Sequence, residues 1–110
     1  MRIPNAEKAV VDIRKLRDYC LNPNHEVGKH KARIFAAAFG LTSADASELQ
    51  TALLEAIKNI DAEIGRLDEY GQRYIIDFNF EWKGKHGIIR SGWIIKTDSE
   101  APTLVTCLPI

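Results

Sequence analysis

Two histidines and two lysines fall within one short stretch of the chain that ends at Lys31. They are His25, Lys29, His30 and Lys31 itself. Histidine exchanges protons near neutral pH, and lysine supplies positive charge for a phosphate or a developing oxyanion. If the stretch joins a loop to a helix, the free N–H groups of the helix start would also face a bound anion. We therefore expect a functional site here. The competing interpretation is that His25 caps or stacks locally and that the lysines are solvated.

A second group of polar side chains lies near the C-terminus, in sequence rich in strand-forming residues. Side-chain alternation along a strand places Ser91 and Trp93 on one face and Arg90 on the other. By the same rule, Thr106 is expected on the same face as Leu104. Each residue also has an ordinary structural explanation, since strand tryptophans and threonines are usually buried and arginines are usually solvated. A functional role requires these residues to converge with the His25 loop.

Helical segments are predicted over about the first 60 residues. Asp12 can cap a helix that runs to Cys20, and Pro23 ends it. Helical spacing resumes from Glu26 to Phe39, and Gly40 is a natural C-cap. A third helix is expected to start at Ser43. Its apolar stripe consists of Ala46, Leu49, Leu53, Leu54 and Ile57.

After about residue 63 the apolar period changes to two, which is typical of strands. Within residues 74–80, every second residue is large and apolar or aromatic, and the residues between them are Ile75, Asp77 and Asn79. Residues 83–87 are expected to form a turn. Further strands are predicted over 88–97, 104–108 and 64–70. The fold class is therefore α+β, with N-terminal helices followed by an antiparallel sheet of about four strands. We expect one domain over 1–110, with a helical part over about 1–60 and a sheet part over about 64–110.

The 110 residues include 15 Lys and Arg and 15 Asp and Glu, but the charges are unevenly distributed. Residues 1–35 carry eight basic and four acidic side chains, residues 36–81 carry three and nine, and residues 82–110 carry four and two. If the two basic ends meet in space, they form a positive face suited to phosphate. No apolar run is long enough to cross a membrane, and the N-terminus lacks the apolar stretch of a signal peptide. We therefore expect no membrane partner and a cytoplasmic location.

Metal and cofactor sites are not expected. His25 and His30 are five residues apart, which does not suit one helical face, and no cluster of cysteines or carboxylates completes a ligand set. The glycines form neither a dinucleotide fingerprint nor a phosphate-binding loop, so no cofactor is predicted. Cys20 and Cys107 lie beside large apolar residues, and they are expected to fill the core rather than to form a disulfide.

One spaced set of residues extends over nearly the whole chain. It reads Leu16-x-x-Tyr19-x-Leu21-Asn22-Pro23-x-His25-x-x-Gly28-x-x-Lys31-Ala32-x-x-Phe35, then Trp93-Ile94-Ile95, then Pro102-x-Leu104-Val105-Thr106-Cys107. This pattern resembles a small prokaryotic family, domain of unknown function 6883. The layout of helices followed by a sheet is similar to the barnase/EndoU/colicin/RelE superfamily of ribonuclease toxins. The resemblance implies a metal-independent endoribonuclease that serves as the toxin of a toxin–antitoxin or polymorphic toxin system.

The resemblance also implies roles for individual residues. His25, Lys31 and Thr106 would be catalytic. The expected substrate-binding residues are Lys29, His30, Arg90, Ser91 and Trp93. His25 would take the proton of an RNA 2′-hydroxyl, and Lys31 and Thr106 would stabilise charge on the phosphate oxygens. The implied partners are RNA and a cognate antitoxin or immunity protein.

An alternative function is a non-catalytic binding module, such as an antitoxin, immunity protein or adaptor. It would use the acidic middle of the chain to meet a basic partner. An exposed apolar stripe on the helix that carries Leu49, Leu53 and Ile57, together with the lack of a concave basic site, would favour this alternative.

Overall fold

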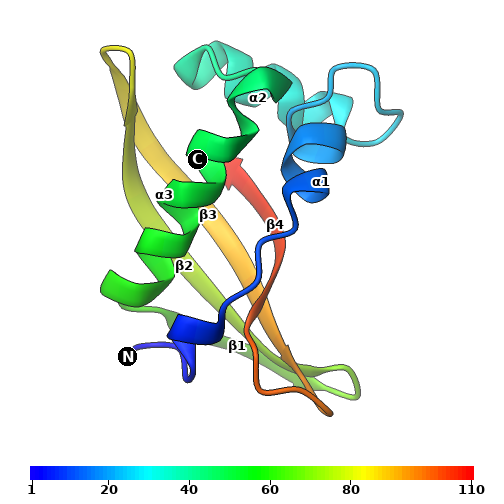
Figure 1. Cartoon of the computed structure of the whole chain (residues 1–110), viewed down its shortest axis with the longest axis vertical. Coiled ribbons are helices and arrows are strands. Elements are labelled where there is room, and N and C mark those ends of the chain that lie inside the picture. Colours follow the sequence, from blue (N-terminus) through cyan, green and yellow to red (C-terminus); the bar gives the residue numbers. More distant parts are fainter.

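The structure is a computed structural model that describes residues 1–110, and it confirms the predicted α+β fold (Figure 1). Helical elements come first and a four-stranded sheet follows. The helical elements are the 3-10 turn η1 (Ala6–Lys8), α1 (Ile13–Lys15), the π-helical turn η2 (Leu16–Cys20), α2 (Lys29–Phe39), the 3-10 turn η3 (Ser43–Asp45) and α3 (Ala46–Asn59). The strands are β1 (Glu63–Asp68), β2 (Gly71–Trp82), β3 (Lys85–Lys96) and β4 (Thr103–Pro109).

The helix boundaries follow from local capping. As predicted, the Asp12 side chain accepts a hydrogen bond from the Arg14 N–H at 3.0 Å and begins α1. The predicted single helix to Cys20 instead changes into η2, because the Leu21 N–H reaches the Leu16 carbonyl at 2.8 Å. This wider turn keeps both Leu16 and Cys20 buried.

The second and third helices end and begin on different signals. Gly40 terminates α2 as expected, because its φ of 73° is a left-handed conformation that glycine adopts without strain. The sequence analysis placed the start of α2 too early, at Glu26. A reciprocal capping box between Thr42 and Asp45 starts the third helical segment.

The strands form an antiparallel meander in the order β1-β2-β3-β4. Long β2 and β3 pair along their whole length, with Tyr74 opposite Trp93 and Asp77 opposite Arg90. Their connection is tighter than the predicted 83–87 turn. Only Lys83 and Gly84 form it, both at positive φ, a geometry that matches the strand twist.

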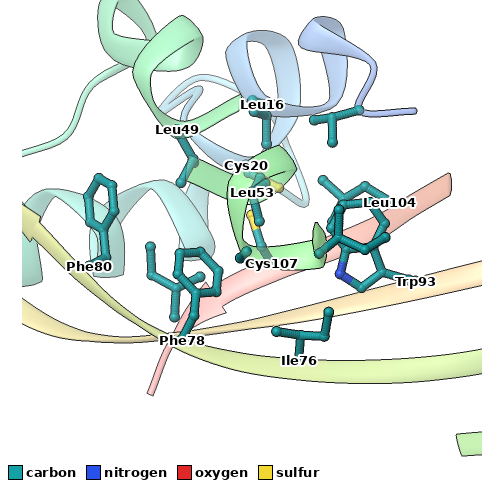
Figure 2. Close-up of a cluster of buried hydrophobic side chains, with 14 of the residues drawn as sticks. Leu16, Cys20, Leu49, Leu53, Ile76, Phe78, Phe80, Trp93, Leu104 and Cys107 are labelled. Carbon is teal, nitrogen blue, oxygen red and sulfur yellow. The ribbon is translucent and has the colours of Figure 1, made fainter. Parts of the chain in front are cut away.

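The helices pack against one face of the sheet, here called the inner face (Figure 1). The predicted alternation in β2 is confirmed, since Tyr74, Ile76, Phe78 and Phe80 are all buried on that face. They pack with the α3 stripe and with residues from η2, β3 and β4, as the close-up in Figure 2 shows. The opposite, outer face of β2 is largely exposed.

A bulge in β4 changes the expected facing of its side chains. Thr106 pairs with Gly92, but the next residue of β3, Trp93, pairs with Leu104, so Val105 is an extra residue in the ladder. Leu104 therefore faces the core beside Trp93, whereas Thr106 lies on the outer face. The expectation that Leu104 and Thr106 share a face was wrong, because simple alternation fails across a bulge.

No helix in the structure is long and apolar enough to span a lipid bilayer.

Candidate functional site

The His25 loop is held together by a side-chain cap on the backbone. The His25 Nδ1 atom accepts hydrogen bonds from the N–H groups of Val27, at 3.1 Å, and Gly28, at 2.9 Å. An atom that accepts two N–H donors carries no proton, so the neutral ring carries its proton on Nε2. His25 also stacks edge-on against Tyr19, with 4.9 Å between the ring centroids. The structure therefore contains both contacts of the competing interpretation, in which His25 caps the backbone and stacks locally.

The spacing of His25, Gly28 and Lys31 has a direct structural explanation. Gly28 packs against the backbone of η2 so closely that an added Cβ would lie 2.2 Å from the Tyr19 carbonyl oxygen. One turn later, the Lys31 Nζ atom lies 5.9 Å from the centroid of the Tyr19 ring, within range of a cation–π interaction. Tyr19 is therefore the common contact of all three motif residues, and Lys31 is directed by it.

Two adjoining hollows lie on the outer side of the sheet and share Ile75, Gly92 and Thr106. The Lys31 hollow has a volume of about 380 Å³ and is lined by Lys31, Ile75, Arg90, Gly92, Thr106, Cys107, Leu108 and Ile110. The Arg73 hollow has a volume of about 350 Å³ and is lined by Gly65, Arg66, Arg73, Tyr74, Ile75, Gly92, Trp93, Val105 and Thr106. Gly92, which carries no side chain, and Thr106 lie where the two hollows adjoin.

Four cationic side chains line these hollows, and three of them are in ion pairs. Arg90 makes a two-pronged contact with Asp77, at 2.8 and 2.9 Å. Arg66 and Arg73 both contact Asp68, at 2.8 and 3.2 Å. The hydrogen bond from Arg90 lowers the pKa of Asp77, and the hydrogen bond from Arg66 is the largest contribution that lowers the pKa of Asp68 to about 2. Both carboxylates are therefore ionised at neutral pH and hold the guanidinium groups in place.

Lys31 differs from these arginines because no carboxylate lies within ion-pair distance of it. Its charge is half-buried and directed by an aromatic ring rather than neutralised by an acid. A cation in this state can approach an anionic ligand without first breaking an ion pair. One basic residue from each end of the chain, Lys31 and Arg90, lines this hollow.

The Thr106 hydroxyl is buried and lacks a hydrogen-bond partner of ordinary strength. The Cys20 thiol lies close to it, but sulfur is only a weak acceptor. A buried hydroxyl without a good partner is uncommon in folded proteins. The residue lines both hollows, and rotation about its Cα–Cβ bond would be needed to direct the hydroxyl toward a ligand there.

The other predicted site residues lie elsewhere. Ser91 and Trp93 are buried on the inner face, where the Trp93 indole N–H donates to the Ser91 hydroxyl at 2.9 Å and that hydroxyl donates to the Ile76 carbonyl. Lys29 and His30 are exposed on the first turn of α2 and line neither hollow. The structure thus brings Lys31, Arg90 and Thr106 together and places Lys29, His30 and Ser91 outside both hollows. Trp93 borders the Arg73 hollow, but its side chain is buried in the core.

Arg66 and Arg73 were missed by the sequence analysis. A second bulge, in β1, places Gly65 and Arg66 opposite Arg73 and so brings the two arginines to one hollow. Bulges leave little trace in residue spacing; the only local signal here is Gly65, since glycine inside a strand often accompanies one.

No group of three or more His, Cys, Asp or Glu side chains is placed to hold a metal ion.

Comparisons with known proteins bear on the family and on the fold. A family model described as "Domain of unknown function (DUF6883)" matches residues 2–110, which agrees with the resemblance noted from the motif. The fold is similar to that of a chain in a contact-dependent growth inhibition toxin–immunity protein complex from Klebsiella pneumoniae 342, with a TM-score of 0.65 and 17% identity. The match covers 93% of this chain and 100% of that chain. A search of curated proteins gave no match.

Proposed function

The chain belongs to the DUF6883 family, and we propose that it is a toxin-type endoribonuclease that cleaves RNA without a metal ion on the outer face of its sheet. The observation that carries this proposal is the convergence of Lys31 from α2, Arg90 from β3 and Thr106 from β4 on one hollow. Its fold likeness to a chain of a toxin–immunity complex supports the toxin context.

The hollows suit the backbone of a nucleic acid. Phosphate oxygens are recognised by arginine forks and lysine charges, and such contacts provide much of the affinity of nucleic-acid-binding proteins. Arg66 and Arg73 extend the cationic surface away from Lys31, so that successive phosphates of one strand could be bound. The apolar side chain of Ile75 between them offers a surface for a ribose or a base.

The proposed chemistry relies on charge stabilisation. The RNA 2′-oxygen attacks the adjacent phosphorus, the 5′-oxygen leaves, and a 2′,3′-cyclic phosphate forms. Lys31 and the Thr106 hydroxyl stabilise the charge that develops on the non-bridging oxygens, while Arg90 holds the phosphate. Loss of one such donor typically reduces a rate by roughly 10²- to 10³-fold. Neither hollow is lined by a carboxylate or a histidine, so the proton of the 2′-hydroxyl would pass to solvent and the leaving 5′-oxygen would take a proton from solvent.

We assign His25 a positioning role in place of the general-base role implied by the family resemblance. Its Nδ1 atom is engaged with two backbone N–H groups, so its Nε2 atom presents a proton rather than a lone pair. These hydrogen bonds fix the turn before α2 and hence the place of Lys31. This positioning role requires no proton transfer by the His25 ring.

The test is cleavage of a defined RNA by the purified protein in the presence of EDTA. We expect cleavage with 2′,3′-cyclic phosphate ends, reduced at least 100-fold by Lys31→Ala and by Thr106→Val. Lys58→Ala is the matched control, because Lys58 is exposed on α3 and lines neither hollow. A folded wild-type protein that leaves RNA intact, or equal rates for Lys31→Ala and Lys58→Ala, would contradict the proposal.

The alternative function, a non-catalytic binding module, was expected to have an exposed apolar stripe on α3, and the structure has no such exposed stripe. Leu49, Leu53 and Ile57 are completely buried, so the α3 stripe does not face a partner. A toxin that is neutralised by a second protein is compatible with the same site, since an acidic partner could cover the cationic hollows. Loss of RNA cleavage on addition of such a partner would identify that arrangement.

A further inference from the structure

Two thiols from opposite ends of the chain meet in the core. Cys20 is the last residue of η2, and Cys107 lies on β4, next to Thr106. Both side chains are almost completely buried, at 1% and 0% exposure, and both are free thiols. Figure 2 shows their sulfur atoms directed toward one another between Leu53 and the sheet.

The β4 bulge is responsible for this meeting. Cys107 pairs with the buried Ser91 and therefore faces the helices. If Val105 occupied a regular place in the ladder, alternation from Leu104 would turn Cys107 to the outer face, away from η2. Residue spacing predicted that both cysteines fill the core but left open whether they approach each other, and the register of β4 brings them together.

The two thiols interact and have different acidities. A hydrogen bond from the Cys107 thiol lowers the pKa of Cys20, and the same contact together with burial raises the pKa of Cys107 well above its ordinary value. The nearby Lys31 charge lowers the pKa of both thiols. Cys20 is therefore the thiol of the pair that forms a thiolate more readily, and thiolates are the nucleophiles in disulfide exchange.

We propose that Cys20 and Cys107 are a disulfide site, which closes when the chain folds in the presence of a small-molecule disulfide such as oxidised glutathione. The Cys20 thiolate attacks one sulfur of the oxidant and releases one glutathione thiol. The Cys107 thiolate then attacks the Cys20 sulfur of the mixed disulfide and releases the second glutathione thiol. The two cysteine thiols lose two protons and two electrons, and one oxidised glutathione becomes two reduced glutathiones.

The crosslink would connect η2, whose Tyr19 directs Lys31, to β4, which carries Thr106. Cys20 follows Tyr19, the residue that contacts His25, Gly28 and Lys31, and Cys107 follows Thr106. A bond between η2 and β4 therefore restrains Lys31 relative to Thr106. It also closes a loop from residue 20 to residue 107, and crosslinks over long loops restrict the unfolded chain most strongly.

The experiment is refolding of the full chain in oxidised glutathione, with refolding in excess dithiothreitol for comparison. We expect a monomer whose intact mass is lower by about 2 Da, a peptide that links Cys20 to Cys107 after proteolysis, and a Tm higher by roughly 10 °C than that of the reduced protein. Cys20→Ala and Cys107→Ala should each show no difference in Tm between the two conditions.

An unchanged mass for the folded wild type, a crosslink only between chains, or an oxidised monomer with a lower Tm than the reduced protein would overturn the proposal. Because either alanine substitution could itself weaken the core, the comparison of oxidised with reduced wild-type protein is the primary measurement. Crosslinking and Tm are measured without RNA, so the result stands apart from the proposed ribonuclease function.

Discussion

Gly92 and Thr106 face each other across β3 and β4 on the outer side of the sheet, and a Cβ added to Gly92 would lie 3.8 Å from the Thr106 methyl group. This pair occupies the junction of the two cationic hollows. It exists because Val105 is an extra residue in the ladder, which turns Thr106 outward and Cys107 inward. The place of Val105 outside the ladder thus fixes the facing of both Thr106 and Cys107.

Deletion of Val105 should remove the bulge and leave the facing of its neighbours unchanged. In the shortened β4, Leu104 still pairs with Trp93 and Thr106 with Gly92, so alternation keeps both Leu104 and Cys107 on the inner face. Because only a half-buried side chain is lost, we expect a free energy of unfolding lower by about 1 kcal/mol in urea denaturation, close to that of Val105→Ala. A loss of more than about 3 kcal/mol for the deletion, of the size caused by removing a large core side chain, would contradict this register.

Gly28→Ala should be far more harmful than Gly40→Ala. The new methyl group at position 28 would meet the Tyr19 backbone at 2.2 Å, and the motif loop would have to move away from η2. At position 40 the methyl group meets nothing within 4 Å, so the cost is that of a left-handed φ, about 1 kcal/mol. Thermal unfolding of both variants measures the difference. A Gly28→Ala protein as stable as Gly40→Ala would contradict the close packing of the loop on η2.

Substitutions of His25 separate a positioning role from proton transfer. His25→Ala removes the acceptor for the Val27 and Gly28 N–H groups, and loss of such a cap costs about 0.5–2 kcal/mol. Asparagine also caps well, so His25→Asn should retain much of that stability and most of the RNA cleavage rate. The pH profile of cleavage should be the same for His25→Asn and wild type. A fall of 100-fold or more in a stable His25→Asn protein would show that the imidazole transfers a proton, as the family resemblance implies.

The Asp68 carboxylate should make stability depend on pH in the acid range. Hydrogen bonds from the Arg66 side chain, the Tyr70 N–H and the Arg73 side chain lower its pKa in the folded protein to about 2, from an ordinary value of 3.8. A lowered folded-state pKa favours folding fully above pH 4, and this contribution is lost as the pH falls toward 2. The Tm of wild type should therefore exceed that of Asp68→Asn at pH 6, and the gap should narrow between pH 4 and pH 2. Asp98→Asn, at an exposed carboxylate without an ion pair, should have the Tm of wild type at pH 6.

Much of the fold could be predicted because it depends on neighbours in sequence. The Asp12 cap, the end of α2 at Gly40 and the buried face of β2 all rest on contacts within a few residues or on a simple period. The start of α2 was placed at Glu26, whereas the regular helix begins at Lys29; the residues just before it form a turn in which the His25 side chain accepts from the Val27 and Gly28 N–H groups. No helical period contains that information.

The candidate site, like the fold, was predictable from the sequence only in part. Its residue types were visible in the sequence: Lys31 and Thr106 were expected as catalytic residues beside His25, and Arg90 was one of the five expected substrate-binding residues. The charge pattern predicted a positive face if the two basic ends meet. The Ser91 and Trp93 side chains instead pack on the inner face, and although Trp93 also borders the Arg73 hollow, only burial reveals this packing.

The sequence by itself determined the α+β class, the order of the elements and the motif from His25 to Lys31, because capping, periodicity and turn chemistry are local. Tertiary structure alone decided which distant side chains meet. The bulges in β1 and β4 set the register by single residues, and a shift of one residue exchanges the two faces of a strand. For that reason Arg66 reaches Arg73, Thr106 reaches the outer face and Cys107 reaches Cys20, and no spacing along the chain records these pairs.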